Sequence, residues 1–275
     1  MDLTLHRGRV ALVTALASAA LCAAFAGQAS AAGHHSHGAV VHIIKPRLRA
    51  NANSSNNWFG YNQGTLEQGG KQFNSIAGDW TVPTASQHAS GDEASSDWIG
   101  IGGGCVDANC TVGDSTLIQT GTEQDVSSGS ASYGAWWELI PGPSIAISNM
   151  TVRPGDHMHA DISEVVAGAN VWTITLQNVT RGQTFTTTVP YTSTHATAEW
   201  IEETPLLIGT NAGLAALPNL TTVPFTGAKV NGAPANLQAA EKILLTDANG
   251  SVIGTPSDPN GTRDGFSACA WATSC

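Results

Sequence analysis

The sequence predicts an all-β fold, an antiparallel sandwich or a barrel. From residue 58 to about residue 254, short segments of alternating apolar and polar residues are separated by turn residues such as Arg153-Pro154-Gly155-Asp156, a pattern typical of antiparallel strands. No segment shows a sustained helical stripe with caps, apart from a possible turn around 237–243. Charged residues form only 12% of the 275 residues, about half the usual share of roughly 25%, and 41% are hydrophobic, a balance that argues against a disordered chain.

The first 31 residues (1–31) are predicted to be a secretory signal peptide. Arg7 and Arg9 precede an apolar run from Val10 to Gly27, and Ala29-Ser30-Ala31 supplies a cleavage site of small residues. No later segment is long and apolar enough to span a bilayer. We therefore expect a secreted, extracellular protein with no membrane segment once the signal peptide has been removed.

Residues 32–50 form a short basic, histidine-rich segment, which is predicted to be a propeptide or a linker. Beyond residue 50 the chain carries six basic and 20 acidic side chains, a formal charge of −14. This balance excludes general nucleic-acid binding, which needs basic clusters, and it suits an acidic medium. The opposite charges of the segment and the body suggest that the propeptide inhibits its own chain.

The four cysteines that follow the signal peptide are Cys105, Cys110, Cys269 and Cys275. In an oxidising compartment they are expected to form two disulfides, for which three connectivities are possible. Cys105–Cys110 with Cys269–Cys275 is favoured because each pair closes a short loop. Intervening stretches of four and five residues fit no usual zinc pattern, and no metal or other cofactor is expected.

Several individual strands can be assigned from the alternation of apolar and polar residues. The clearest one covers 171–179, where Trp172, Ile174 and Leu176 share one face, and residues 184–189 are rich in Thr and Phe. His157, His159 and Asp161 also share a face; it is better explained as a solvated strand face than as a metal site. Gly113-Asp114-Ser115 resembles the surroundings of a nucleophilic serine, but it lacks the strand–turn–helix context.

Acidic and amide residues set among tryptophans are the rarer feature of these strands. Apolar neighbours remove water from a carboxyl group and raise its pKa into a range useful for catalysis. Alternation places side chains from three strands in same-face groups: Leu117, Gln119 and Gly121; Gly134, Trp136 and Glu138; Glu199, Ile201 and Glu203.

Six short motifs follow one another along the chain: Asn57-Trp-Phe-Gly-Tyr61, Trp80-Thr-Val-Pro83, Trp98-Ile-Gly-Ile101, Leu117-Ile-Gln-Thr-Gly121, Tyr133-Gly-Ala-Trp-Trp-Glu138 and Ala198-Glu-Trp-Ile-Glu202. They occur in the order found in the glutamic peptidases, the eqolisin or peptidase G1 family, which the chain therefore resembles over about residues 57–232. Each motif is weak alone, whereas six in order are strong. The resemblance implies an antiparallel β-sandwich of two large sheets, a concanavalin A-like jelly roll, that binds substrate in a groove on one concave sheet.

The resemblance also implies a catalytic pair, Gln119 and Glu199. A glutamate can take a proton from the attacking water and return it to the leaving amine, while a glutamine amide can donate to the oxyanion. Substrate-binding and supporting roles are implied for Trp58, Trp98, Trp136 and Glu138. The expected protein is a monomeric acid endopeptidase that cleaves unfolded polypeptides, is insensitive to pepstatin and needs no metal.

The chain departs from the family pattern at Gly102 and Gly134, where fungal members carry acids. Fewer like charges near Glu199 would alter the pH optimum. Domain bounds of 51–254 for the sandwich and 255–275 for a disulfide-containing tail are expected. Two alternatives remain: a glycoside hydrolase using Glu138 and Glu199, which would need carboxyl groups roughly 5–9.5 Å apart, and a non-catalytic carbohydrate-binding module.

Overall fold

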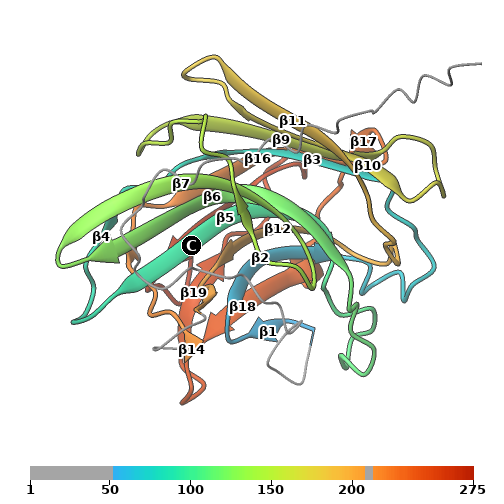
Figure 1. Ribbon diagram of the computed structural model, residues 1–275. Helices are drawn as coiled ribbons and strands as arrows, with labels where there is room; N and C mark the ends of the chain where they lie inside the picture. Colours follow the sequence, from blue (N-terminus) through green and yellow to red (C-terminus); the bar gives the residue numbers. More distant parts are fainter. Residues whose placement is uncertain (1–51, 208–212) are drawn as a thin grey trace, which may run out of the picture. The chain divides into compact units, whose positions relative to one another are not determined.

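The computed structural model describes residues 52–207 and 213–275, which form an almost entirely β domain (Figure 1). The predicted signal peptide and the 32–50 segment lie outside the described residues. No helix in the described part of the chain has the length and hydropathy needed to cross a membrane. The possible turn near 237–243 is one 3-10 turn, η1 (Ala239–Glu241).

The long strands, together with the short strand β8, form one continuous hydrogen-bonded path that folds into two large sheets. The first, called sheet I, has the order β11-β10-β9-β3-β16-β20-β19-β18, and the second, called sheet II, has the order β2-β12-β5-β6-β7-β8. Strand β18 pairs with both β19 and β2 and so joins the sheets. Because the path ends at β11 and β8 without closing, the fold is an antiparallel β-sandwich and not a barrel.

The bounds of the long strands follow the predicted alternation. Sheet I contains β3 (Ser75–Thr81), β9 (His157–Glu164), β10 (Val171–Asn178), β11 (Gln183–Pro190), β16 (Val223–Val230), β18 (Lys242–Thr246), β19 (Val252–Pro256) and β20 (Phe266–Ala270). Sheet II contains β2 (Trp58–Gln63), β5 (Glu93–Gly102), β6 (Leu117–Ser127), β7 (Ser130–Leu139), β8 (Ile145–Ala146) and β12 (Ala198–Glu203). The short strands are β1 (Ser54–Ser55), β4 (Ala85–Ser86), β13 (Leu206–Leu207), β14 (Gly213–Leu214), β15 (Asn219–Leu220) and β17 (Ala233–Pro234).

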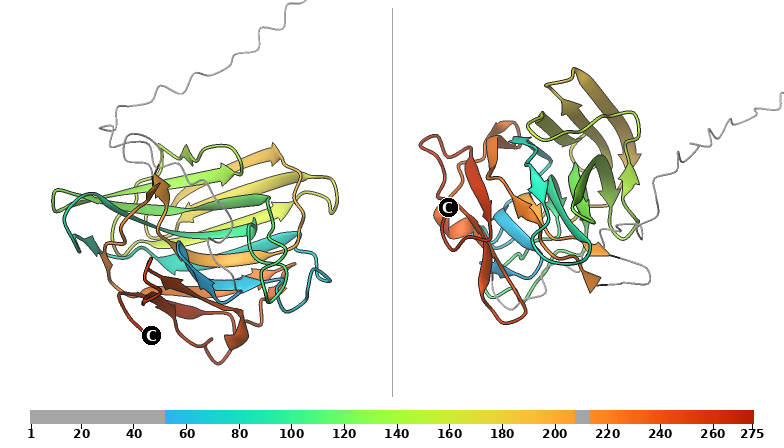
Figure 2. Two further views of the ribbon diagram at one scale, coloured as in Figure 1. Left: turned by 90° about the horizontal axis from the view of Figure 1, so that it is seen from below. Right: turned by 90° about the vertical axis from the view of Figure 1, so that its left-hand side faces the viewer.

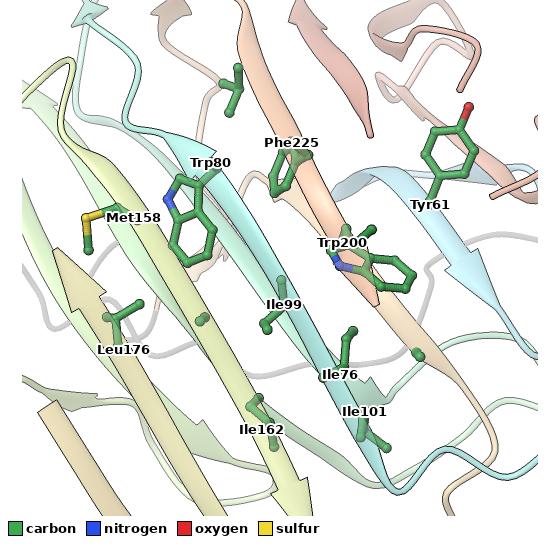
Figure 3. Close-up of a cluster of buried hydrophobic side chains, with 14 of the residues drawn as sticks. Tyr61, Ile76, Trp80, Ile99, Ile101, Met158, Ile162, Leu176, Trp200 and Phe225 are labelled. Carbon is green, nitrogen blue, oxygen red and sulfur yellow. The ribbon is translucent and has the colours of Figure 1, made fainter. Parts of the chain in front are cut away.

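The main core lies between the two sheets. Figure 3 shows part of it, with Trp80 and Met158 of sheet I near Ile99 and Trp200 of sheet II. Two indoles bridge the sheets by hydrogen bonds: Trp80 Nε1 donates to Thr122 Oγ1 and Trp200 Nε1 to Ala77 O, both at 2.9 Å. Since truncating a buried tryptophan to alanine costs about 3–5 kcal/mol, these two residues fix how the sheets pack.

The outer face of sheet I is solvated at the position of the histidine pair. His157 is exposed and His159 is half-buried, while Met158 between them is buried. Both rings lie against Asp79 Oδ1, at 3.0 Å from His157 Nε2 and 3.2 Å from His159 Nδ1. The described residues contain no metal-binding cluster of His, Cys, Asp and Glu.

The C-terminal segment is built into sheet I. Residues 255–275, which the sequence analysis separates as a tail, supply the end of β19 and all of β20, and β20 pairs with β16 and β19. Phe266 stacks on Phe225 with ring centroids 4.9 Å apart, and its burial explains why this segment joins the sheet. In both views of Figure 2 the red C-terminal strands lie on the opposite side of the domain from gold β11.

Both disulfides have the pairing that the short loops favoured. Cys105 is bonded to Cys110 with a Cα–Cα distance of 5.0 Å, and Cys269 to Cys275 with 5.6 Å. The first closes the loop that follows β5, and the second ties β20 to the last residue of the chain.

Candidate active site

One face of sheet II carries the predicted catalytic residues in a single row. Directly opposite residues of paired strands point to the same side of a sheet. Strand β12 lies between β2 and β5, and β6 lies between β5 and β7, as Figure 1 shows. The strand register aligns five residues across these strands: Asn62, Glu199, Gly100, Gln119 and Glu138.

The neighbouring rows on this face carry the predicted tryptophans. Trp98 lies opposite Ile201 and Gly121, and Trp136 also lies opposite Gly121. Together with Trp58 they belong to a second apolar cluster, separate from the core between the sheets. The structure therefore brings all four predicted substrate-binding residues and both predicted catalytic residues to one face.

Polar contacts hold two of the indoles in place. Trp98 Nε1 donates to Glu203 Oε2 at 2.8 Å, and Trp136 Nε1 donates to Ser96 Oγ at 3.0 Å. The Trp58 ring meets the Trp98 ring edge-on, with centroids 4.9 Å apart. The buried tryptophans beside the row of polar residues are thus held in fixed orientations.

Gly121 permits the close approach of Trp98. A Cβ at position 121 would lie 2.2 Å from Asp97 O and 2.6 Å from Trp98 Cβ. Any larger residue would push β5 and β6 apart, so the glycine of the Leu117–Gly121 motif is required by packing.

Gln119 is fully buried and is held by Glu138. Its Nε2 donates to Glu138 Oε2 at 2.6 Å. Its Oε1 is also buried and has no hydrogen-bond partner among the described residues. A buried amide oxygen without a partner is costly, and it marks the position where a water or substrate group would be bound.

Glu199 is fully buried opposite Gln119, with only the backbone of Gly100 between them in the row. The loop that follows β5 approaches it closely: a Cβ at Gly104 would lie 2.6 Å from Glu199 Oε1. This loop is tied to β12 because Gly104 N donates to Thr197 Oγ1 at 3.2 Å and Gly102 N to Thr197 O at 2.9 Å.

The structure explains both departures from the family's acidic pattern. Gly102 has φ +102°, which side chains rarely adopt, and a Cβ there would lie 2.0 Å from Thr116 O. At Gly134 the space is filled from the neighbouring strand, since a Cβ would lie 2.6 Å from Glu123 Oε1. One missing carboxyl group therefore has no room, and the other is replaced by Glu123 on the same face.

A second pair of acids lies on the opposite face of the same strands. Asp97 of β5 and Glu202 of β12 are directly paired and both are fully buried. Burial raises the pKa of Asp97 to about 6. Burial, together with the neighbouring Asp97 carboxylate, raises the pKa of Glu202 well above its usual range. The sequence analysis missed this pair. The signal in the sequence was an acidic residue next to a large apolar residue in each of the two strands.

Comparisons with known proteins agree with this geometry. A family model described as the peptidase A4 family matches residues 56–263. No curated protein matches the chain. Among solved structures, scytalido-glutamic peptidase with a transition state analog inhibitor is 19% identical, with a TM-score of 0.61 over 78% of this chain and 98% of that one.

Two further solved structures are similar. SCP-B, an eqolisin in complex with the tripeptide Ala-Ile-His, is 19% identical, with a TM-score of 0.55 over 78% of this chain and 98% of its own. Aspergilloglutamic peptidase from Aspergillus niger is 24% identical, with a TM-score of 0.52 over 65% of this chain and 99% of its own. At these identities the likeness establishes a shared β-sandwich fold.

Proposed function

Because this chain belongs to the peptidase A4 family, the glutamic peptidases, we propose that it is a secreted acid endopeptidase that hydrolyses unfolded polypeptides. The observation that carries the proposal is the row in which Glu199 and Gln119 flank Gly100 on one face of sheet II. Two strand spacings of about 4.8 Å separate their backbones by about 10 Å. Two long side chains can therefore act on one peptide group from opposite sides.

Glu199 is the proposed general base and acid. Its carboxylate takes a proton from a water molecule as the water oxygen attacks the scissile carbonyl carbon, and a tetrahedral intermediate forms. The same carboxyl group then gives a proton to the amine nitrogen as the C–N bond breaks. The scheme requires neither a covalent intermediate nor a metal ion, so we expect turnover to survive pepstatin and a chelator.

Gln119 is proposed to stabilise the oxyanion. Its Nε2 has two N–H groups, one of which is bonded to Glu138, so the other is free to donate to the negatively charged oxygen. Its Oε1, which has no partner among the described residues, accepts a hydrogen bond from the attacking water. Because Glu138 accepts only from the N–H side of the amide, it fixes which end of the Gln119 side chain faces the oxyanion.

The tryptophans beside the row are proposed to bind the substrate. Trp58, Trp98 and Trp136 present large rigid rings on the face that carries Glu199, and such rings bind extended chains with little loss of side-chain entropy. Direct contact of Glu138 with the substrate remains a prediction; its observed partner is Gln119.

Inhibition by the 32–50 segment is a further part of the proposal. The segment, which lies outside the described residues, is basic, whereas the active face carries Glu199, Glu138, Glu203 and Glu123. The signal peptide predicted from the sequence and the two disulfides support the proposal of secretion.

The test is digestion of an unfolded protein by the purified wild type and by Glu199→Gln, across about pH 2–7, which brackets the reference glutamate pKa of about 4.3. Pepstatin and a chelator are present. We expect acid-side cleavage by the wild type and a loss of about 10²–10⁴-fold in the variant. Glu164→Gln, the same change on β9 of sheet I, is the matched control and should cleave like the wild type.

Equal turnover by Glu199→Gln would remove Glu199 from its role. Cleavage of a glycan without cleavage of protein would favour the glycoside hydrolase. For that alternative, the carboxyl groups of Glu138 and Glu199, whose backbones are three strand spacings or about 14 Å apart in the row, would have to approach to roughly 5–9.5 Å.

A further inference from the structure

The carboxamide of Asn62 lies beside Glu199 at the β2 end of the catalytic row. Asn62 is buried and directly opposite Glu199 in the register of β2 and β12. Its amide group lies near three acceptors, Glu199 Oε1, Gln63 O and Cys105 O, and near the Thr65 hydroxyl, which also lies 2.5 Å from Cys105 O.

One orientation of this amide satisfies Glu199, Gln63 and Thr65 together. With Nδ2 toward β12, Asn62 donates to Glu199 Oε1 at 3.0 Å and to Gln63 O at 2.9 Å, and its Oδ1 accepts from Thr65 Oγ1 at 2.9 Å. The opposite orientation directs Nδ2 to Thr65 Oγ1 at 2.9 Å and to Cys105 O at 3.3 Å, but it sets the amide oxygen against the Glu199 carboxylate and Gln63 O. Since hydrogen bonding fixes the orientation of an asparagine side chain, the N–H of Asn62 points at Glu199.

We propose that Asn62 is a positioning residue, which holds Glu199 in the orientation and the ionised form that accept a proton from water. The inference rests on the proposed function. A hydrogen bond to a charged group is stronger than one between neutral groups, and here it is made in a buried site. The backbone of Gly104 packs closely against both groups, since a Cβ there would lie 2.5 Å from the Asn62 amide and 2.6 Å from Glu199 Oε1.

Asn62 is an uncharged neighbour of Glu199 on a face that also carries several acidic residues. On this face Glu203 belongs to the same strand as Glu199, Glu138 comes from β7 and Glu123 from β6. The facing positions of β2 and β5 are Asn62, Gly60, Gly100 and Trp98, which do not titrate in this pH range. The carboxylates disfavour ionisation of Glu199, and the Asn62 N–H opposes them.

The test compares the pH dependence of kcat/KM for the wild type and Asn62→Leu, which keeps the size of the side chain and removes the donor. Activity should rise with pH as Glu199 ionises. Without the N–H of Asn62, this rising part of the pH profile, the acid limb, should move to a pH about one to two units higher. The KM should change less than about threefold. Gln63→Leu is the matched control: it removes the next buried amide of β2, which donates to Ala235 O, and should leave the acid limb in place.

Asn62→Asp is a second variant, which keeps the test decisive if Asn62→Leu fails to fold. At acid pH its protonated carboxyl group can still donate to Glu199, so activity should persist there. A second limb should appear on the alkaline side, where both carboxyl groups ionise. Acid limbs that coincide in the wild type and Asn62→Leu, or an unchanged alkaline side in Asn62→Asp, would overturn the proposal.

Titration of Glu199 itself separates this inference from the proposed function. In protein labelled with ¹³C at the glutamate carboxyl carbons, with the signal assigned through Glu199→Gln, the midpoint for Glu199 should be higher in Asn62→Leu. This readout needs no turnover. An unshifted midpoint rejects the role of Asn62, whereas absent turnover by the wild type rejects only the peptidase activity.

Discussion

At the residue scale, the site depends on a neutral amide held by a carboxylate. Gln119 cannot orient itself, because its two amide ends are similar in shape and differ only in hydrogen bonding. Glu138 removes this ambiguity by accepting from Nε2 at 2.6 Å. The sequence motifs identified both Gln119 and Glu138. Their contact could not be predicted, because it depends on the register of β6 and β7, which local sequence does not show.

Replacing the carboxylate that holds Gln119 should slow catalysis more than binding. In Glu138→Gln the new amide can present either end to Gln119, so the oxyanion donor is misplaced in part of the molecules. We expect kcat to fall about tenfold or more with KM within about threefold, measured on a fluorogenic peptide. Thr120→Val removes a bond between the same strands on the other face, Thr120 Oγ1 to Trp136 O at 2.7 Å, and should leave kcat within about twofold.

A single methyl group at the loop beside Glu199 should also disturb the site. In Gly104→Ala the added Cβ would meet Glu199 Oε1 at 2.6 Å, and the carboxylate must move. We expect kcat/KM to fall at least about tenfold, since small displacements in an active site cost up to about 10²-fold. Gly261→Ala, where a Cβ meets nothing within 4 Å, serves as the control. Wild-type rates in Gly104→Ala would contradict the described geometry.

At the element scale, β5 and β12 place acids on both of their faces. One face carries Glu199, and the other buries Asp97 against Glu202 in the core between the sheets. Alternation within each strand predicted the first face correctly from the sequence. The second pair could not be predicted, because it depends on which strands are neighbours.

The buried pair should make the fold less stable as the pH rises. The pKa of Asp97 is raised to about 6 by burial, and that of Glu202 is raised well above its usual range by burial and by the neighbouring Asp97 carboxylate. A buried carboxyl group with a raised pKa destabilises the folded state once it must ionise. This destabilisation is absent below the unfolded pKa of about 4, where the group is protonated in both the folded and the unfolded state. Destabilisation then grows between about pH 4 and pH 6 and above.

Glu202→Gln should flatten this dependence. The amide cannot ionise, and it can donate to Asp97. We expect the fall in Tm between pH 4 and pH 7, followed by circular dichroism, to be smaller than in the wild type. Each kcal/mol relieved corresponds to about 2–4 °C for a domain of this size. Asp92→Asn, at an exposed loop position, is the control. Equal Tm losses in Glu202→Gln and the wild type would show that the pair does not set the pH response.

Strand β20 marks another limit of sequence reasoning. Phe266, Ala268 and Ala270 alternate over only five residues, too short a stretch to separate from a loop by pattern alone. Its place between β16 and β19 follows from the long-range contacts of Phe266 with Tyr61 and Phe225.

At the scale of the whole molecule, charge is divided between the N-terminal segment and the body. Residues 32–50 contain Lys45, Arg47 and Arg49, whereas the chain beyond residue 50 has a formal charge of −14. The two large sheets and the site face were predictable because the six motifs occur in family order. The joining of the sheets through β18 was not, since it depends on pairing with both β2 and β19.

A peptide covering residues 32–50 should inhibit protein from which that segment has been removed. We expect inhibition near neutral pH at low salt, weakening as salt rises to 1 M, where the Debye length falls to about 3 Å. The control peptide carries glutamine at positions 45, 47 and 49. Equal inhibition by both peptides, or none by the first, would contradict an electrostatic propeptide.

The central claim is that Glu199 and Gln119 act as one unit in a single chemical step. Its most direct test is kcat/KM for Glu199→Gln, Gln119→Ala and the double variant. Each single change should cost about 10²–10⁴-fold, and the double variant should match the slower single variant within about threefold, because residues that act together are not additive. Losses that multiply in the double variant, or a single variant with wild-type activity, would contradict the account.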